Sequence, residues 1–123
     1  MKLPIDGRYL SLATWRRDGR EVRTPVWYVT LGGVHYCYTT RDAGKVKRIR
    51  RSSCARLAPC DWRGRLRGGW CEARARLVDD ATLCAQVYTA LRRKYGWQMR
   101  LLDLIATFSR RRDRRAVIAL EEI

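Results

Sequence analysis

Apolar and polar positions along the first 40 residues predict three antiparallel β-strands. Tyr9–Trp15 alternates between two faces, and Val22–Thr30 and Val34–Thr40 are rich in β-branched and aromatic residues. The dipeptides Asp18-Gly19 and Gly32-Gly33 supply the turns between them. Three strands so close together in the chain are typical of a meander, not of a βαβ unit.

The remaining pattern predicts three helices and three further strands. The helices are expected at Lys45–Arg51, from Asp79 or Asp80 to Gly96, and at Met99–Phe108. The strands are expected at Cys54–Asp61, Trp70–Val78 and Ala116–Ile123. The strand Trp70–Val78 alternates cleanly, with Cys71, Ala73, Ala75 and Leu77 on the inward face. This order indicates a mainly β protein, a small antiparallel barrel of six strands with helices packed outside it.

Composition narrows the class of protein. A chain of 123 residues is expected to form one domain spanning 1–123, and its net charge of +15 favours polyanionic partners. Such partners are a nucleic acid, an acidic membrane surface or a multiply charged small molecule. No apolar stretch reaches the length of a membrane span, and no signal peptide is recognised. Five cysteines without a CxxC pair suit a reducing compartment, so we expect a cytoplasmic protein.

Catalytic side chains give no signal of their own. The chain contains no Ser-His-Asp set, no paired catalytic carboxylates and no Walker-type loop, so hydrolase and NTPase functions have no support. The single histidine, His35, leaves no zinc ligand set. An enzyme of this kind would depend on a cofactor that supplies the chemistry.

Five segments in order carry a resemblance to a known family. They are TPVWY (Thr24–Tyr28), YTTRDAGKVKRIRR (Tyr38–Arg51), RLAPCDWRGR (Arg56–Arg65), EARARLVDD (Glu72–Asp80) and RRKYG (Arg92–Gly96). Together they resemble the pyridoxamine-phosphate-oxidase-like split barrels, closest to the short branch of coenzyme F420-dependent enzymes. The resemblance covers nearly the whole chain. It implies a Greek-key split barrel and a homodimer with two flavin or deazaflavin sites at its interface.

The resemblance implies that the segment after the third strand holds the cofactor phosphate. The residues it assigns to this role are Thr39, Thr40, Arg41, Gly44 and Lys45. Elementary physics agrees, because a helix N-terminus after a glycine-containing turn binds anions, and a cation strengthens those hydrogen bonds. The alternative is that the cations of this helix form a solvated face, and we expect that of Lys47, Arg50 and Arg51.

A second segment, Arg23–Trp27, is implied to contact the cofactor. Arg23 matches a phosphate contact of the FMN-using members, and the resemblance places Thr24, Pro25, Val26 and Trp27 beside the ring. Pro25 lacks an N–H group, so its strand is expected to be an edge strand, or bulged or open there. On composition alone, Trp27 is better explained as a residue of the core or of the dimer interface. Tyr28 stands where FMN-using members carry a lysine, which weakens the FMN interpretation.

The loop after Asp61 is a further candidate. Trp62 is expected to stack on a cofactor across the dimer, and Arg63, Arg65 or Arg67 to meet an anionic tail. The alternative is a solvated hairpin loop. The run Arg110–Arg115 is expected to solvate a connection.

These observations predict an F420-dependent oxidoreductase that transfers a hydride between the reduced deazaflavin and a small conjugated substrate. A basic groove suits the phosphodiester and polyglutamate tail of F420 better than it suits FMN. The alternatives are an FMN-binding oxidoreductase of the same fold and, from another class, a non-enzymatic barrel that binds nucleic acid through its charge. Catalytic residues and the physiological substrate are not predicted.

Overall fold

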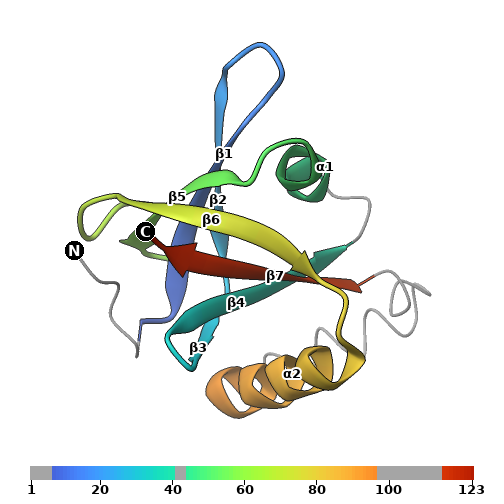
Figure 1. Cartoon of the computed structure of the whole chain (residues 1–123). Coiled ribbons are helices and arrows are strands. Elements are labelled where there is room, and N and C mark those ends of the chain that lie inside the picture. Colours follow the sequence, from blue (N-terminus) through green and yellow to red (C-terminus); the bar gives the residue numbers. More distant parts are fainter. Residues whose placement is uncertain (1–6, 41–43, 97–114) are drawn as a thin grey trace.

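The computed structural model describes residues 7–40, 44–96 and 115–123. Their seven strands form one antiparallel sheet in the order β2-β1-β5-β6-β7-β4-β3, which curls into a barrel (Figure 1). The elements are β1 (Tyr9–Trp15), β2 (Glu21–Val26), β3 (Val29–Leu31), β4 (Val34–Thr40), α1 (Gly44–Arg51), β5 (Cys54–Cys60), β6 (Cys71–Val78), α2 (Ala81–Tyr95) and β7 (Arg115–Glu122).

The expected barrel is confirmed, but the predicted count of six strands is wrong. The predicted strand Val22–Thr30 is interrupted at Trp27 and Tyr28, which separates β2 from β3. β2 pairs with β1, whereas β3 pairs with β4, so these two consecutive strands lie at opposite edges of the sheet. The predicted meander is therefore two hairpins joined at a break. The barrel is split at this break, next to Pro25.

Both helices within the described residues begin and end close to their predicted positions. α1 buries Val46 and Ile49, as the pattern indicated. The side chain of Asp80 caps α2 by accepting hydrogen bonds from the backbone N–H groups of residues 82 and 83. Gly96 ends α2 with a positive φ of 58° and donates its N–H to the Arg92 carbonyl. The predicted helix Met99–Phe108 lies outside the described residues.

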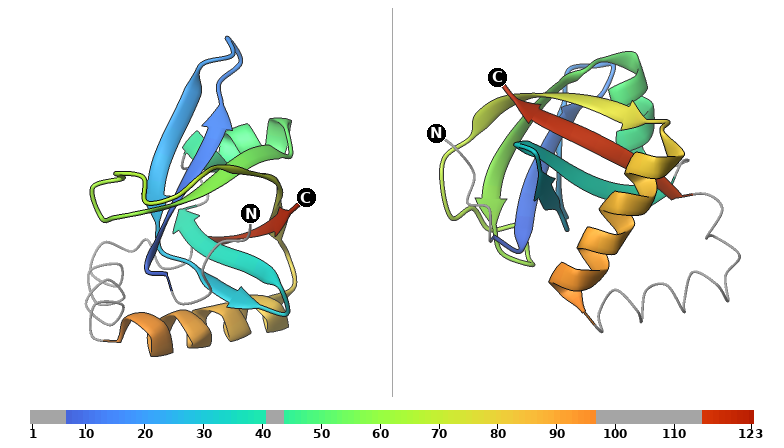
Figure 2. Two further views of the ribbon diagram at one scale, coloured as in Figure 1. Left: turned by 90° about the vertical axis from the view of Figure 1, so that its left-hand side faces the viewer. Right: turned by 60° about the horizontal axis from the view of Figure 1, so that its bottom comes forward.

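Two hydrophobic clusters hold the fold together. The barrel interior contains Leu10, Leu12, Tyr28, Cys37, Leu57, Ala73, Ala75, Ile118 and Leu120, all at most 2% exposed. The second cluster lies between α2 and the outer face of β4 and β7, and contains Tyr36, Val87, Leu91, Tyr95, Val117 and Ala119. Figure 2 shows α2 crossing these strands on the outside of the barrel. No described helix is long and apolar enough to cross a membrane.

The break at Tyr28 is held by the last turn of α2. Tyr28 has left the ladder, yet its backbone N–H donates to the Tyr95 hydroxyl at 3.0 Å and its carbonyl accepts from Lys94 Nζ at 2.7 Å. The single proton of the Tyr95 hydroxyl has two carbonyl acceptors, Arg8 at 2.7 Å and Tyr28 at 3.0 Å. Because Lys94 already donates a hydrogen bond to the Tyr28 carbonyl, the Arg8 carbonyl is the better acceptor for the Tyr95 proton. We call Lys94 and Tyr95 the Tyr28 clamp.

Tyr95→Phe tests the clamp. It removes the hydroxyl and leaves the N–H of Tyr28, which is 1% exposed, without a partner. We expect a loss of about 1–3 kcal/mol in the free energy of unfolding, measured by urea denaturation, because an unsatisfied buried donor keeps its full desolvation cost. Tyr36→Phe is the control, since the Tyr36 hydroxyl makes no hydrogen bond within the described residues. Equal losses in the two variants would contradict the clamp.

Candidate functional site

The break in the barrel opens a cleft of about 310 Å³. We call it the split cleft, and its walls come from β1, the end of β2, β4, α1 and the loop after β5. Its lining residues are Tyr9, Pro25, Val26, Trp27, Tyr38, Lys45 and Trp62. Five of these seven, all except Tyr9 and Tyr38, are among the residues predicted to bind the cofactor. Segments far apart in the sequence therefore converge on one site.

Trp27 forms a wall of the split cleft because the chain leaves the ladder there. Its ring stacks on Tyr95 with a centroid distance of 4.5 Å and an interplanar angle of 8°. It also packs against the cluster under α2. The two interpretations of Trp27, core residue and cofactor contact, are thus compatible: one part of the side chain packs on α2 while another part faces the cleft.

Lys45 is the cation of the split cleft. It lies on the first turn of α1, is half-buried, and has no carboxylate within ion-pair distance among the described residues. Burial lowers the pKa of Lys45. The nearby thiol of Cys37 supplies no counter-charge, because burial raises its pKa to about 12. A partly desolvated ammonium beside the N–H groups of a helix start is suited to an anion such as a phosphate oxygen.

The loop between β5 and β6 brings Trp62 to the split cleft. Asp61 fastens this loop: it accepts hydrogen bonds from the backbone N–H groups of Arg63 and Arg65 and from the Arg65 guanidinium, each at 2.9 Å. Gly64 has a positive φ of 86°, which favours glycine at this turn, and it lies beside the Pro25 ring. Trp62 remains 64% exposed. The Arg63 guanidinium lies over its ring, 4.8 Å from the centroid, and the exposed remainder of the ring is available to a ligand or a partner chain.

Other predicted residues lie outside the split cleft. Arg23 is on the outer face of β2, where its guanidinium lies over Trp70 at 4.8 Å and binds Glu21 at 2.7 Å. Thr24 is half-buried and pairs with Leu12 of β1.

The remaining predicted residues surround the start of α1 or lie in the loop. Thr39 is half-buried on β4, and Gly44 is the exposed first residue of α1. Arg67 is exposed, and its backbone N–H donates to the Pro59 carbonyl at 2.8 Å. The side chain of Thr40 and all of Arg41 lie outside the described residues.

Sequence reasoning missed three residues of this region. Tyr9 and Tyr38 line the split cleft from β1 and β4, and Asp61 positions the loop. The alternating pattern could have revealed the two tyrosines, because each is a large aromatic residue at a position of its strand that points away from the barrel interior. The role of Asp61 depends on the conformation of the loop, for which the pattern of apolar residues carries no signal.

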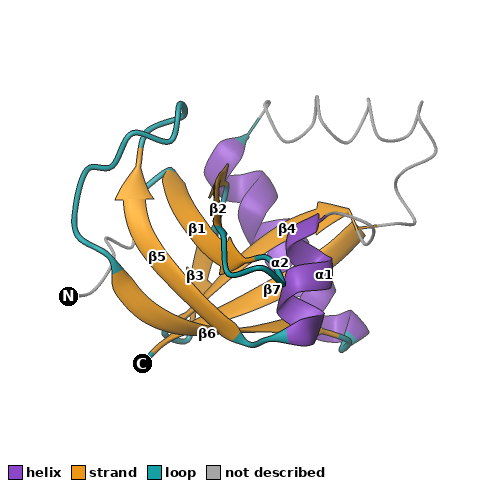
Figure 3. Ribbon diagram, turned by 90° about the horizontal axis from the view of Figure 1, so that it is seen from above, coloured by secondary structure: helices purple, strands orange, loops and turns teal. Residues whose placement is uncertain are grey.

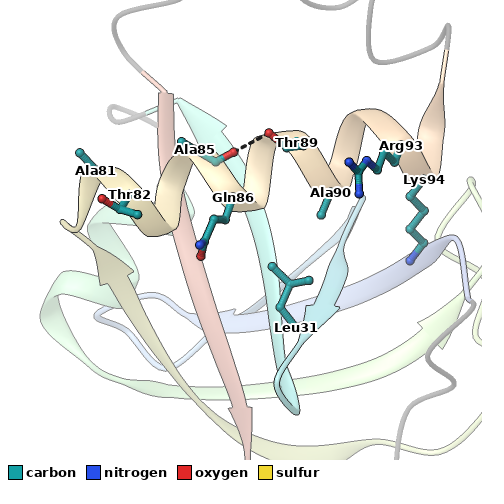
Figure 4. Close-up of a pocket in the computed structure, with 9 residues that line it drawn as sticks. All are labelled: Leu31, Ala81, Thr82, Ala85, Gln86, Thr89, Ala90, Arg93 and Lys94. Carbon is teal, nitrogen blue, oxygen red and sulfur yellow. Dashed lines mark hydrogen bonds between the residues drawn. The ribbon is translucent and has the colours of Figure 1, made fainter.

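A larger groove of about 1110 Å³ runs along α2, and Figure 4 shows its lining. Most lining side chains are small or uncharged residues of α2, with Leu31 of β3 beneath them. Its two cations are Arg93 and Lys94, and the Lys94 ammonium is already bonded to the Tyr28 carbonyl. Of the predicted cofactor residues that the structure describes, none lines this groove. We therefore assign the candidate site to the smaller split cleft.

The single histidine belongs to a separate polar cluster. His35 is 2% exposed, with its two ring nitrogens 2.7 Å from the Thr30 hydroxyl and 2.8 Å from a Glu122 carboxylate oxygen. The other oxygen of Glu122 accepts from the Cys71 thiol at 3.4 Å. Among the described residues, no group of three or more His, Cys, Asp or Glu side chains is arranged to hold a metal ion. The cluster satisfies buried polar groups.

Solved structures share this architecture. HutZ, the heme storage protein of Vibrio cholerae, superposes with a TM-score of 0.72 at 15% identity, covering 94% of this chain and 82% of that protein. An F420 reductase gives a TM-score of 0.62 at 18% identity, with 97% and 90% covered. A candidate pyridoxamine 5'-phosphate oxidase from Listeria innocua gives 0.62 at 13% identity, with 94% and 83% covered. This chain has the pyridoxamine-phosphate-oxidase-like split-barrel fold.

The resemblance seen in the sequence is thus confirmed for the fold. No protein-family model and no curated protein matches the sequence. The superpositions establish the split-barrel fold, whereas identities this low leave the ligand to be argued from the chemistry of the cleft.

The ionisation of Lys45 tests the geometry of the site. Burial lowers the pKa of Lys45 in the folded protein, so the charged side chain destabilises the fold at low pH. This loss of stability disappears as the pH rises from the lowered pKa to the ordinary one, because the folded protein then releases the proton first. We expect the ¹³Cε resonance of Lys45, identified by its loss in Lys45→Arg, to titrate below the ordinary value of 10.5. Unfolding in urea should restore the ordinary value. A titration at or above 10.5 in the folded protein would mean that the side chain is solvated outside the split cleft.

Proposed function

We propose that the protein is an F420-dependent oxidoreductase whose cofactor binds in the split cleft. The observation that carries the proposal is the convergence of Lys45, without a counter-ion among the described residues, with the aromatic and apolar walls formed by Trp27, Trp62 and Val26. The structural likeness to an F420 reductase supports it.

The lining residues fit a ring system with an anionic side chain. Trp27 and Trp62 offer flat surfaces to a conjugated ring, and Lys45 offers a charge-assisted hydrogen bond to a phosphate oxygen. Among the described residues, no carboxylate lines the cleft to repel the anion. At about 310 Å³ the cleft is at the low end for a cofactor of this size, which suits a site completed by a second subunit.

When bound, the deazaflavin would supply hydride transfer to or from a substrate. The protein groups would fix its position: Lys45 the phosphate, Pro25–Trp27 one edge of the ring, and Trp62 the exposed side. Positioning of this kind requires no acid or base from the chain. The exposed Arg63 and Arg67 beside Trp62 are suited to the carboxylates of a polyglutamate tail, which favours F420 over FMN.

Heme, the cargo of HutZ, is a weaker candidate. Within the part of the chain that the structure describes, no histidine, cysteine or methionine lines the split cleft, and these are common axial ligands of heme iron. The chain's one histidine, His35, has both ring nitrogens engaged by Thr30 and Glu122.

Cofactor choice is tested by titrating the purified protein with F420 and with FMN at matched ionic strength, followed by fluorescence. We expect tighter binding of F420, because its anionic tail gains contacts with the basic loop. Equal or tighter binding of FMN would overturn the choice of cofactor. Binding of neither, with tight binding of single-stranded nucleic acid, would favour the non-enzymatic alternative.

Lys45→Ala tests the phosphate contact. We expect F420 binding to weaken by about 1.5–3 kcal/mol, the usual contribution of a hydrogen bond to a charged group. Lys47→Ala is the matched control, because Lys47 is exposed on the same helix and its loss should cost less than about 1 kcal/mol. Equal weakening by the two substitutions would indicate that the cations act through their overall charge and do not form a site. The same conclusion would follow if added salt removed the effect of Lys45→Ala as fully as that of Lys47→Ala.

We further propose that the active form is a homodimer with cofactor sites at its interface. The low volume of the split cleft and the exposure of Trp62 on its rim support this. Light scattering is expected to give about twice the 14.4 kDa mass of the chain at micromolar concentration. A mass of one chain throughout that range would exclude the shared site.

A further inference from the structure

The β1–β2 hairpin extends past the barrel as a two-stranded ribbon. β1 pairs with β5 only over residues 9–13, whereas its pairing with β2 continues to Trp15 opposite Glu21. Residues 14–22 therefore have no third strand beside them among the described residues. Figure 1 shows this ribbon projecting beside α1, and Figure 3 shows α1 from above. The ribbon and α1 together form a surface that the proposed cofactor site does not use.

This surface concentrates positive charge. Its exposed cations are Arg16, Arg17 and Arg20 in the turn and Lys47, Arg50 and Arg51 on α1. α1 contains no acidic residue. Of the acidic residues near the turn, Asp18 binds Arg20 at 2.8 Å and Glu21 binds Arg23 at 2.7 Å. The other five cations named have no carboxylate within 4.0 Å among the described residues.

Two hydrogen bonds lock the ribbon to α1. Arg48 Nε donates to the Thr14 hydroxyl at 2.7 Å, and Arg51 Nη2 donates to the Trp15 carbonyl at 2.5 Å. Burial and then the positive charges of Arg16 and Arg51 lower the pKa of Arg48, so like charges are held close together here. Arg48 and Arg51 are held in place, and the other cations of the surface are exposed close to them, an arrangement suited to a row of phosphates.

We propose that this surface, the β1–β2 ribbon with α1, binds the phosphate backbone of double-stranded DNA. A two-stranded ribbon fits the major groove of B-form DNA, while the deep, narrow major groove of A-form RNA does not admit it. The exposed large apolar residues within the described part of the chain are Trp62, Leu66 and Ile123, none of them on this surface. It therefore lacks the aromatic platforms that bind single strands and the apolar side chains that insert into membranes.

The proposal goes beyond the cofactor site and is independent of it. Its contacts would be sequence-independent, because they are made with phosphates, and strongly dependent on salt. The DNA would be bound by residues of the ribbon and the outer side of α1, whereas F420 would be bound by Lys45 and the split cleft. Saturating F420 should therefore leave the affinity for DNA unchanged.

The test measures binding of a fluorescent 20-base-pair DNA duplex by anisotropy between 50 and 300 mM salt. A plot of log affinity against log salt concentration has a negative slope. In Arg16→Ala/Arg17→Ala the magnitude of this slope should decrease by about two, because each lost phosphate contact removes about 0.9. At 0.1 M salt this corresponds to binding weaker by roughly tenfold to a hundredfold. Lys47→Ala/Arg50→Ala, on the second element of the surface, should have a similar effect.

The control is Arg92→Ala/Arg93→Ala, which removes the same charge from the exposed last turn of α2. We expect its slope to stay within about half a unit of the unmodified protein's, and thermal melting verifies that every variant is folded. Equal loss in the control, or no duplex binding at 50 mM salt, would overturn the proposal. Tighter binding of duplex RNA, of single strands or of vesicles with anionic lipid than of duplex DNA would also overturn it.

Discussion

The architecture depends on how the chain stabilises a break in its own sheet. A strand that stops pairing inside a barrel exposes backbone N–H and C=O groups, and burying them unpaired is costly. Here the last turn of α2 supplies both missing partners of Tyr28, a hydroxyl for its N–H and an ammonium for its carbonyl. Burial raises the pKa of the Tyr95 hydroxyl, so it stays protonated and keeps a proton to donate. The hydrogen bonds from this helix thereby offset the free-energy cost of an opening in the barrel.

That opening is also what gives the protein a site. β2 and β3 diverge to opposite edges of the sheet, and Trp27 is left between them, stacked on Tyr95. The start of α1 forms another wall of the same cleft, where Lys45 is half-buried without a counter-ion among the described residues. The clamp and the aromatic wall thus belong to one interruption, the cation lies beside it, and the proposed chemistry relies on positioning a cofactor.

The sequence predicted most of the elements, because alternation and capping are local signals. Asp80 and Gly96 marked the ends of α2, and the strand Cys71–Val78 was apparent from its pattern. The division of Val22–Thr30 was not predictable in the same way. Apolar and β-branched residues continue through it, and what interrupts it is a contact with Tyr95, which lies 67 residues from Tyr28. Arg23 was placed by resemblance, but its strand turns it outward onto Trp70. The place of Lys45 on the first turn of a helix was predictable because a helix start is a local feature, whereas its role as a phosphate ligand, implied by the resemblance, stays a prediction.

The central claim is that the proposed cofactor binds in the split cleft. It is tested most directly by the indole N–H signals of the tryptophans in a ¹H–¹⁵N spectrum. Trp27 and Trp62 line the cleft, whereas Trp15 lies at the base of the ribbon and Trp70 between Arg23 and Arg56. Single Trp→Phe variants assign the signals. On addition of F420 the account predicts that the signals of Trp27 and Trp62 shift while those of Trp15 and Trp70 do not. Shifts confined to Trp15 or Trp70, with Trp27 and Trp62 unmoved under saturating F420, would contradict it.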